Sequence, residues 1–143
     1  MEKNNQPFSR PHGVKIAFVR DFNSFTIVNA KFVGTMKPTA SWQDITEVRG
    51  TLQPSCTPDA TGKTHIYTFI AKFRVAYSSQ LNHKKLMKYV GQDVIIRYTS
   101  AAGQERIGGT KENPLTFTFT EVEGFDGYEC TVTGIQKTPE AFI

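Results

Sequence analysis

The chain has 143 residues, 11 of them phenylalanine, and a formal net charge of +4 at pH 7. This length favours a single domain that buries its own core without disulfides or a structural metal. The mild positive charge is compatible with weak attraction to nucleic acid or to an acidic surface, but it excludes the dense basic stripe of a dedicated nucleic-acid binder. The frequent Phe, Thr and Val residues favour β-structure.

No apolar run approaches the roughly 18–20 residues that a membrane-spanning helix needs, and the polar start MEKNNQPFSRPHG has no signal-peptide core. We therefore expect a cytoplasmic chain with no membrane partner. Cys56 and Cys130 lie far apart and form no CxxC or Cys/His cluster, which argues against zinc. We expect two free thiols, with a single bridge between them as the alternative.

The first part of the chain begins with a polar arm over residues 1–13, which we expect to be flexible or to dock on another molecule. A single β domain follows over residues 14–143. Alternating apolar residues predict a first strand over 14–22, and Asn23-Ser24 predicts a turn. A second strand is expected over 25–34, where the polarity of the two faces switches midway, and a β-bulge would account for that switch.

Loops and strands alternate in the next part. Residues 35–44 are predicted to form a loop that contains Trp42, and residues 45–53 a strand. The segment 54–63, PSCTPDATGK, is the clearest predicted loop, and its length suggests a contact loop. The longest predicted strand covers 64–77, and its apolar residues on both faces place it centrally in a sheet.

The period of two breaks at residues 78–91, where a serine can cap a helix and Gly91 can end it. This helix has an apolar stripe of Leu86, Tyr89 and Val90 and a basic one of Lys84, Lys85 and Lys88. Two hairpins are predicted after it, over 93–109 and over 115–134, the second with Leu115, Phe117, Phe119, Tyr128, Cys130 and Val132 pointing inward. Seven or eight strands with one short helix predict an all-β fold, an antiparallel β-sandwich or a small barrel.

The segment GGTKENP, residues 108–114, raises the question of a phosphate-binding loop. Such a loop needs glycines followed by Lys-Ser/Thr at the start of a helix. Here the order is Thr-Lys, and Pro114 leads into an alternating strand. We expect only a turn, with Gly108 and Gly109 supplying positive-φ freedom.

Other catalytic or metal sites have weak support in the sequence. His12, His65 and His83 have no metal-ligand spacing. Glu121 and Glu123 are expected on one face of a strand, where such a pair usually keeps an edge soluble rather than cleaving glycosides. Cys130 is expected to be buried and unreactive. We predict no catalytic residue, no cofactor and no metal, and therefore no enzyme.

Single-stranded nucleic-acid binding by an OB-like module is the alternative function. Aromatic and basic residues interleave on the predicted strands, and the predicted helix has a basic face. The residues that would stack on bases or contact phosphates are Trp42, Tyr67, Phe73, Tyr98, Lys84, Lys85 and Lys88. The same interleaving is common in β-proteins, because core aromatics alternate with exposed cations.

The last part of the chain carries a further pattern, formed by Gly109, Asn113, Pro114, Leu115, Gly127, Tyr128, Thr133, Gly134 and Pro139. With these residues, the region 80–143 resembles small structural proteins of Bacteroidetes phages and prophages. The resemblance implies a β-rich neck or tail component that assembles in the host cytoplasm and ends in the virion. Its partners would be copies of itself, in a homo-oligomeric ring, and other virion proteins. The expected contact segments are 1–13, 54–63 and 135–143, with Pro7, Phe8, Pro54, Pro58, Phe142 and Ile143 as contact residues.

Overall fold

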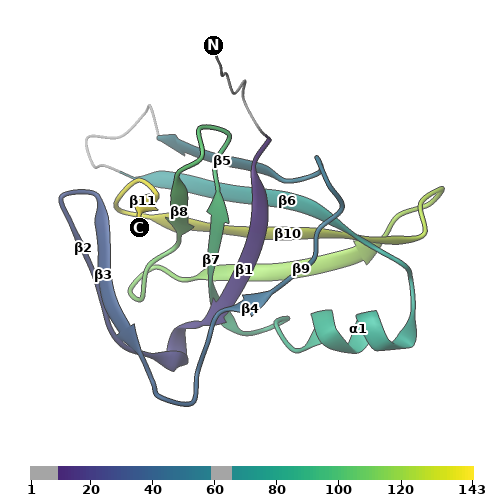
Figure 1. The fold of residues 1–143 in the computed structure, drawn as a ribbon, viewed down its shortest axis with the longest axis horizontal. Coiled ribbons are helices and arrows are strands. Elements are labelled where there is room, and N and C mark those ends of the chain that lie inside the picture. The colour runs from purple at the N-terminus through teal and green to yellow at the C-terminus, as the bar shows by residue number, and fades with distance from the viewer. Residues whose placement is uncertain (1–9, 59–65) are drawn as a thin grey trace, which may run out of the picture.

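The computed structural model describes residues 10–58 and 66–143, and over these residues the protein is all-β with one short α-helix, as predicted (Figure 1). Eleven strands form a single mixed sheet, more than the seven or eight expected. The described part of this sheet is branched and has three end strands, so it does not close into a barrel. No helix among the described residues is long and apolar enough to span a bilayer.

The first elements are β1 (His12–Phe18), a 3-10 turn (Val19–Asp21), β2 (Phe22–Val28), β3 (Lys31–Met36) and β4 (Gln43–Asp44). They are followed by β5 (Gln53–Pro58), β6 (Tyr67–Ala76), the helix α1 (Gln80–Met87) and β7 (Asp93–Thr99). The last elements are β8 (Glu105–Gly108), β9 (Leu115–Glu121), β10 (Gly127–Gln136) and β11 (Ala141–Phe142).

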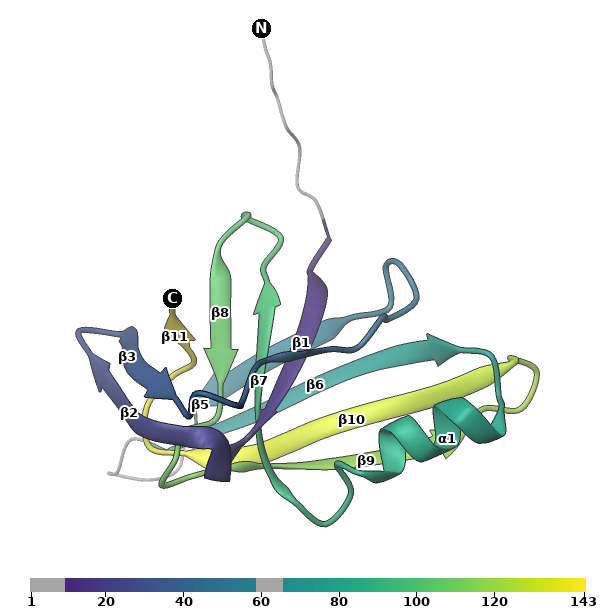
Figure 2. The same ribbon diagram turned by 60° about the horizontal axis from the view of Figure 1, so that its bottom comes forward.

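The sheet has the strand order β2-β3-β11-β8-β7-β9-β10-β6-β5, with β1 paired to β7 and β4 paired to β1. β7 is the junction, because it pairs with three strands, β1, β8 and β9. Figures 1 and 2 show the long strands β6, β9 and β10 crossing β1, β7 and β8 steeply. Two parts of one sheet thus face each other like the layers of an orthogonal sandwich.

The larger hydrophobic cluster fills the space between these two parts. β7 contributes Val94 and Ile96, β6 contributes Phe69, and the buried Leu86 and Tyr89 near α1 pack against the same cluster. The predicted inward residues of the last hairpin are confirmed, since Leu115, Phe117, Tyr128, Cys130 and Val132 are buried and Phe119 packs against them. Burial of this apolar surface is the main source of the fold's stability.

A second, smaller cluster lies on the opposite face of β1, β7 and β8. Its buried members are Ala17, Phe22, Phe25, Ile95 and Ile107, with Phe32 and Trp42 packed against them. The Phe22 ring meets Phe25 and Trp42 edge-to-face, with centroid distances of 5.2 and 5.6 Å. The β2–β3 hairpin therefore covers the outer face of the central strands.

The predicted single strand over 25–34 is wrong, and so is the turn at Asn23-Ser24, which lies inside β2. The chain forms a tight hairpin instead, with Val28 paired to Lys31. Asn29 and Ala30 have φ values of 52° and 63°, the left-handed pair that a two-residue type I′ turn requires. This turn, rather than a bulge, switches the polarity of the two faces.

The prediction for residues 45–63 is also wrong in part. Residues 45–52 form no strand in the structure, whereas β5 (Gln53–Pro58), of which residues 54–58 were expected to be loop, pairs with β6. The rest of the predicted loop, residues 59–63, lies outside the described residues. The central position of β6 is confirmed, since it lies between β5 and β10. Of the predicted arm over 1–13, His12 and Gly13 belong to β1, and residues 1–9 lie outside the described residues.

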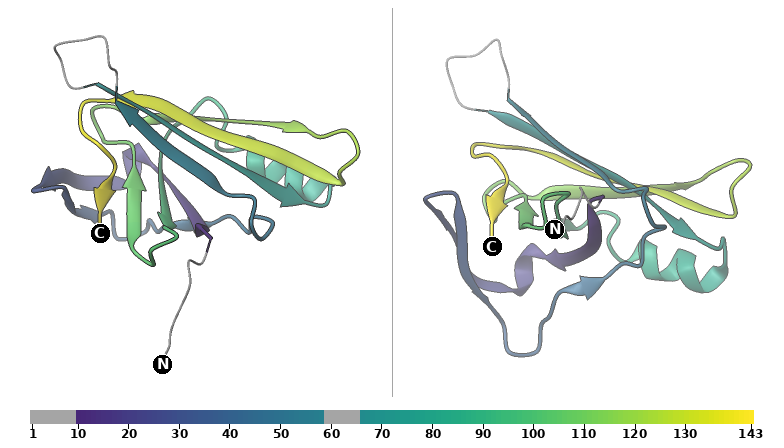
Figure 3. Two further views of the ribbon diagram at one scale, coloured as in Figure 1. Left: turned by 90° about the horizontal axis from the view of Figure 1, so that it is seen from above. Right: turned by 45° about the horizontal axis from the view of Figure 1, so that its top comes forward.

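The helix is confirmed, with Ser79 as its N-cap, since the Ser79 side chain accepts a hydrogen bond from the Asn82 amide. Figure 3 shows α1 alongside β9 and β10, at the end of the molecule away from the β2–β3 hairpin. The hairpin β7–β8 forms where it was predicted.

Because β7 is buried on both faces, we expect Ile95→Ala and Ile96→Ala each to lower the free energy of unfolding by about 2–5 kcal/mol. Ile95 faces the smaller cluster and Ile96 the larger one, and both are 0% exposed. Urea unfolding measures the loss, and Val28→Ala at a half-exposed site is the control, with a change under about 0.5 kcal/mol. A negligible effect of Ile95→Ala would show that the hairpin does not seal the smaller cluster.

Candidate functional site

The predicted contact residues fall at three places. Pro7 and Phe8 lie outside the described residues. Pro54 and Pro58 lie on β5, an end strand of the sheet, rather than in a loop. Phe142 and Ile143 lie at the C-terminal β11, next to β3 and β8. The four described residues therefore lie on or next to two strands, β5 and β11, that do not pair with each other.

The C-terminal segment is anchored to the body by a largely buried polar network. Tyr98 donates a hydrogen bond to the Glu140 carboxylate, and Arg106 Nη2 lies 3.7 Å from the same carboxylate and donates to the Glu140 carbonyl at 2.9 Å. Burial, followed by this contact with Glu140, raises the pKa of Tyr98 far above its usual value. The Phe142 amide donates to the Ala30 carbonyl of the β2–β3 turn. The apolar tail therefore packs on the body of the protein.

Three exposed apolar side chains lie on one face where β2, β3 and β11 are side by side. Val28, Lys31 and Phe142 are neighbours in register across these strands, and Val33 is two residues from Lys31 on the same face. The exposed fractions are 50% for Val28, 55% for Val33 and 36% for Phe142, and the exposed Lys31 lies between Val28 and Phe142. We call Val28, Val33 and Phe142 the apolar patch. The Arg106 guanidinium covers one side of the Phe142 ring at 3.9 Å and borders the patch.

The predicted nucleic-acid set does not come together. Phe73 and Tyr98 are 1% and 2% exposed, so neither can stack on a base, and that part of the prediction is wrong. Trp42 packs on Phe22 in the smaller cluster. Tyr67 is half-buried at the start of β6. Lys84, Lys85 and Lys88 are exposed on or directly after α1, as predicted.

The segment GGTKENP is a turn, as predicted. The Thr110 amide donates to the Asn113 carbonyl, and no helix follows before β9 begins at Leu115. Gly109 has a φ of 89°, whereas Gly108 is needed for a different reason, since a Cβ there would lie 2.5 Å from the Phe69 ring. Only Gly109 therefore uses positive-φ freedom.

The other residues considered as catalytic or metal-binding candidates occupy ordinary structural positions. Glu123 lies in the turn after β9, so the expected shared strand face with Glu121 is wrong. The described residues contain no cluster of three His, Cys, Asp or Glu that could hold a metal. Cys56 and Cys130 are free thiols, as expected, and burial raises the pKa of Cys130 to about 12. A thiol with this pKa is protonated and unreactive at neutral pH.

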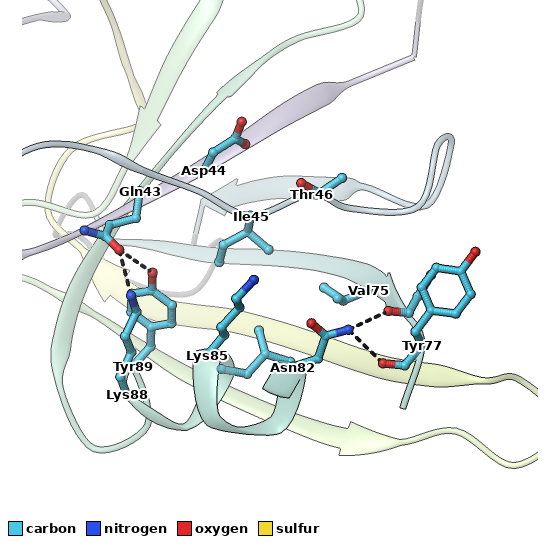
Figure 4. A pocket seen from close by; sticks show the side chains of 12 residues that line it. Gln43, Asp44, Ile45, Thr46, Val75, Tyr77, Asn82, Lys85, Lys88 and Tyr89 are labelled. Carbon is cyan, nitrogen blue, oxygen red and sulfur yellow. Dashed lines mark hydrogen bonds between the residues drawn. The ribbon is translucent and has the colours of Figure 1, made fainter. Parts of the chain in front are cut away.

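A cleft of about 430 Å³ lies between the segment that starts at β4, the end of β6 and the helix α1 (Figure 4). Its floor is apolar, with Ile45, Val75 and Leu86. At one end, Gln43 Oε1 accepts hydrogen bonds from Lys88 Nζ at 2.7 Å and from the Tyr89 hydroxyl at 3.3 Å. The walls are polar: Gln43, Asp44, Thr46, Asn82, Lys85 and Lys88. This combination suits a ligand with a flat apolar part and a charged part.

Tyr77 stands at the other end of the cleft in an unusual backbone conformation. Its φ is 71°, a left-handed value that is strained for a bulky side chain, and its side chain is 71% exposed. Asn82 Nδ2 donates to the carbonyls of Ala76 and Tyr77, and the Tyr77 amide donates to the Asp126 carbonyl. The surrounding hydrogen bonds thus hold a strained residue whose ring faces solvent. Strain of this kind is concentrated at functional sites.

Tyr77, Asn82 and Gln43 were not among the predicted site residues. Nothing in the sequence indicates a positive φ at Tyr77, because the residue is neither Gly nor Asn. The detectable signal is its position, an aromatic residue directly between a long strand and the serine cap of a helix.

Replacing Tyr77 by asparagine is expected to raise the free energy of unfolding by about 1 kcal/mol, because asparagine tolerates the left-handed region and the lost ring is mostly exposed. Urea unfolding of Tyr77→Asn and of the control Tyr77→Phe, which keeps the strain, measures the difference. A loss of stability in Tyr77→Asn would mean that ring contacts stabilise this turn.

Stability is expected to fall at alkaline pH. The Cys130 thiol has a folded pKa of about 12, raised from 9.0 by burial and then by Glu129, so it ionises first in the unfolded chain. Its contribution is complete below pH 9 and is lost as the pH rises towards 12, with a slope of about 1.4 kcal/mol per pH unit. Urea unfolding across this range should give a shallower decline for Cys130→Ala. An unchanged slope would contradict the burial of this thiol.

No family model, curated protein or solved structure matches this chain. The residues of the sequence resemblance have structural roles in the fold: a Cβ at Gly109 or Gly134 would lie 2.8 Å from the Leu115 side chain, and one at Gly127 would lie 2.2 Å from the Val75 carbonyl oxygen. The two candidate functional surfaces are the apolar patch and the cleft.

Proposed function

We propose that the protein is a non-enzymatic structural subunit that self-associates through the apolar patch and the neighbouring edge of β2. The observation that carries this proposal is the contrast between β2 and β5, the strands at the two ends of the main path through the sheet. β5 contains Pro54 and Pro58, whereas β2, with the sequence FNSFTIV, contains neither proline nor a charged residue. Natural proteins protect exposed edges with prolines and lysines, and β2 has neither.

The patch begins on the strand that carries the open edge. Val28 is the last residue of β2, and Val33 and Phe142 belong to the next two strands of the sheet. A contact at this end would bury the apolar side chains and pair the backbone of β2 at the same time. The register of β2 is irregular only between Phe22 and Ser24, so residues 24–28 pair regularly with β3 and present a continuous edge.

The first contact is a two-fold one, β2 against β2 of a second copy. A head-to-tail contact of β2 with β5 would oppose a strand with two prolines, each of which lacks an amide hydrogen. A two-fold contact uses the same surface on both copies and gives a closed dimer. The ring expected from the sequence would need a further, head-to-tail surface.

The particle to which such a subunit would belong is the neck or tail of a phage or prophage, with other virion proteins as partners. The support for this part is the resemblance carried by residues 80–143. The apolar patch is compatible with it, since subunits that assemble need exposed apolar surface before they meet.

Self-association is tested by light scattering behind gel filtration over a wide range of protein concentration. We expect a concentration-dependent mass that reaches an even multiple of 16.0 kDa. Val33→Lys adds a second lysine to the face that already holds Lys31, removes an apolar member of the patch, and should weaken association by about tenfold or more.

Thr118→Lys is the matched control, because Thr118 is exposed on β9 and the charge change is the same. This control should associate like the wild type. A wild-type protein that stays monomeric at every concentration would overturn self-association, and equal weakening in both variants would show a general charge effect.

A further inference from the structure

We propose that the cleft beside α1 binds single-stranded nucleic acid, with one base stacked on Tyr77 and the phosphates placed along the lysines of α1. This site is separate from the apolar patch, because α1 and the β2–β3 hairpin lie at opposite ends of the molecule (Figure 3). The inference therefore does not depend on self-association.

Lys85 and Lys88 line the cleft, the exposed Lys84 lies next to Lys85 outside it, and the helix has no acidic residue to balance them. The segment QLNHKKLMK from Gln80 to Lys88 contains three lysines and no Asp or Glu. Lys84 and Lys85 form no ion pair or hydrogen bond with any residue that the structure describes, and Lys88 contacts only the neutral Gln43 and the Tyr89 ring. Figure 4 shows Asp44 pointing away from Lys85. These cations are therefore free to neutralise phosphates.

The remaining groups of the cleft fit a nucleobase. The exposed Tyr77 ring offers a flat stacking surface at its rim. Asn82 uses its amide nitrogen for the carbonyls of Ala76 and Tyr77, which leaves Oδ1 as an acceptor on the cleft side (Figure 4). A base presents both a flat face and N–H donors at its edge. The apolar floor of Ile45 and Leu86 favours a planar ring over a fully hydrated ligand.

A single strand fits better than a duplex. Stacking on a protein aromatic requires a base that is free of its own neighbours, which a duplex does not offer. The site also differs from the one expected from the sequence. Of that set, only the lysines take part, and Tyr77 replaces Trp42, Tyr67, Phe73 and Tyr98.

Fluorescence anisotropy with a labelled oligothymidylate of about ten nucleotides tests the proposal on the full chain. With three phosphate contacts, the logarithm of affinity should fall with the logarithm of salt concentration with a slope of about −2. The double variant Lys84→Gln, Lys85→Gln should reduce this slope to about −0.7. Lys111→Gln with Lys137→Gln, two exposed lysines elsewhere, is the matched control for net charge and should keep the wild-type slope.

Tyr77→Asn separates binding from folding, because this variant is expected to be more stable than the wild type. It should bind the oligonucleotide at least about tenfold more weakly, whereas Tyr77→Phe should bind within about twofold of the wild type. Absence of binding at low salt, equal loss in both lysine pairs, or full binding by Tyr77→Asn would each overturn the proposal. If free thymidine monophosphate bound with the same affinity as the oligonucleotide, the proposal of a single-stranded ligand would be wrong, and the cleft would be a mononucleotide site.

Discussion

Burial of β7 on both faces is the constraint on which the rest of the structure depends. Val94 and Ile96 point into the larger cluster and Ile95 into the smaller one, and all three are fully buried. A strand of this kind needs a cover on each side, and its edges must be paired because backbone groups cannot remain unpaired away from water. β1 takes one edge of β7, while β8 and β9 share the other, so the sheet divides at this point. The long strands then cover one face and the β2–β3 hairpin covers the other.

Strict alternation in the sequence was sufficient to predict the last hairpin. Apolar residues on both faces predicted the long central strand, and a break in the period of two predicted the helix with its basic face. Two segments failed for identifiable physical reasons. Ala30 occupies a left-handed position where glycine is the usual residue, so the tight turn left no composition signal. The prolines of β5 indicated a loop, although proline is compatible with an end strand that has one unpaired edge. The candidate cleft could not be predicted from the sequence, because only tertiary contacts bring together the segments around Gln43, Tyr77 and Lys85.

The two proposed surfaces differ in their chemistry. The apolar patch consists of branched and aromatic side chains on adjacent strands, a surface that gains free energy when water is removed from it. The cleft combines an unpaired cation with an aromatic ring and a fixed amide, a surface that needs a charged ligand. In a subunit of an assembly, such a division would allow the protein to contact its own copies at one end while single-stranded nucleic acid occupies the cleft at the other end.

β11 is synthesised long after the hairpin with which it pairs. The β2–β3 hairpin is made early in synthesis, yet the strand that joins it to the rest of the sheet is β11, about a hundred residues later in the chain. Until residues 141–142 leave the ribosome, the β3 edge that they will occupy is as open as the edge of β2. Until then the hairpin has two open strand edges, and open strand edges favour pairing with other chains.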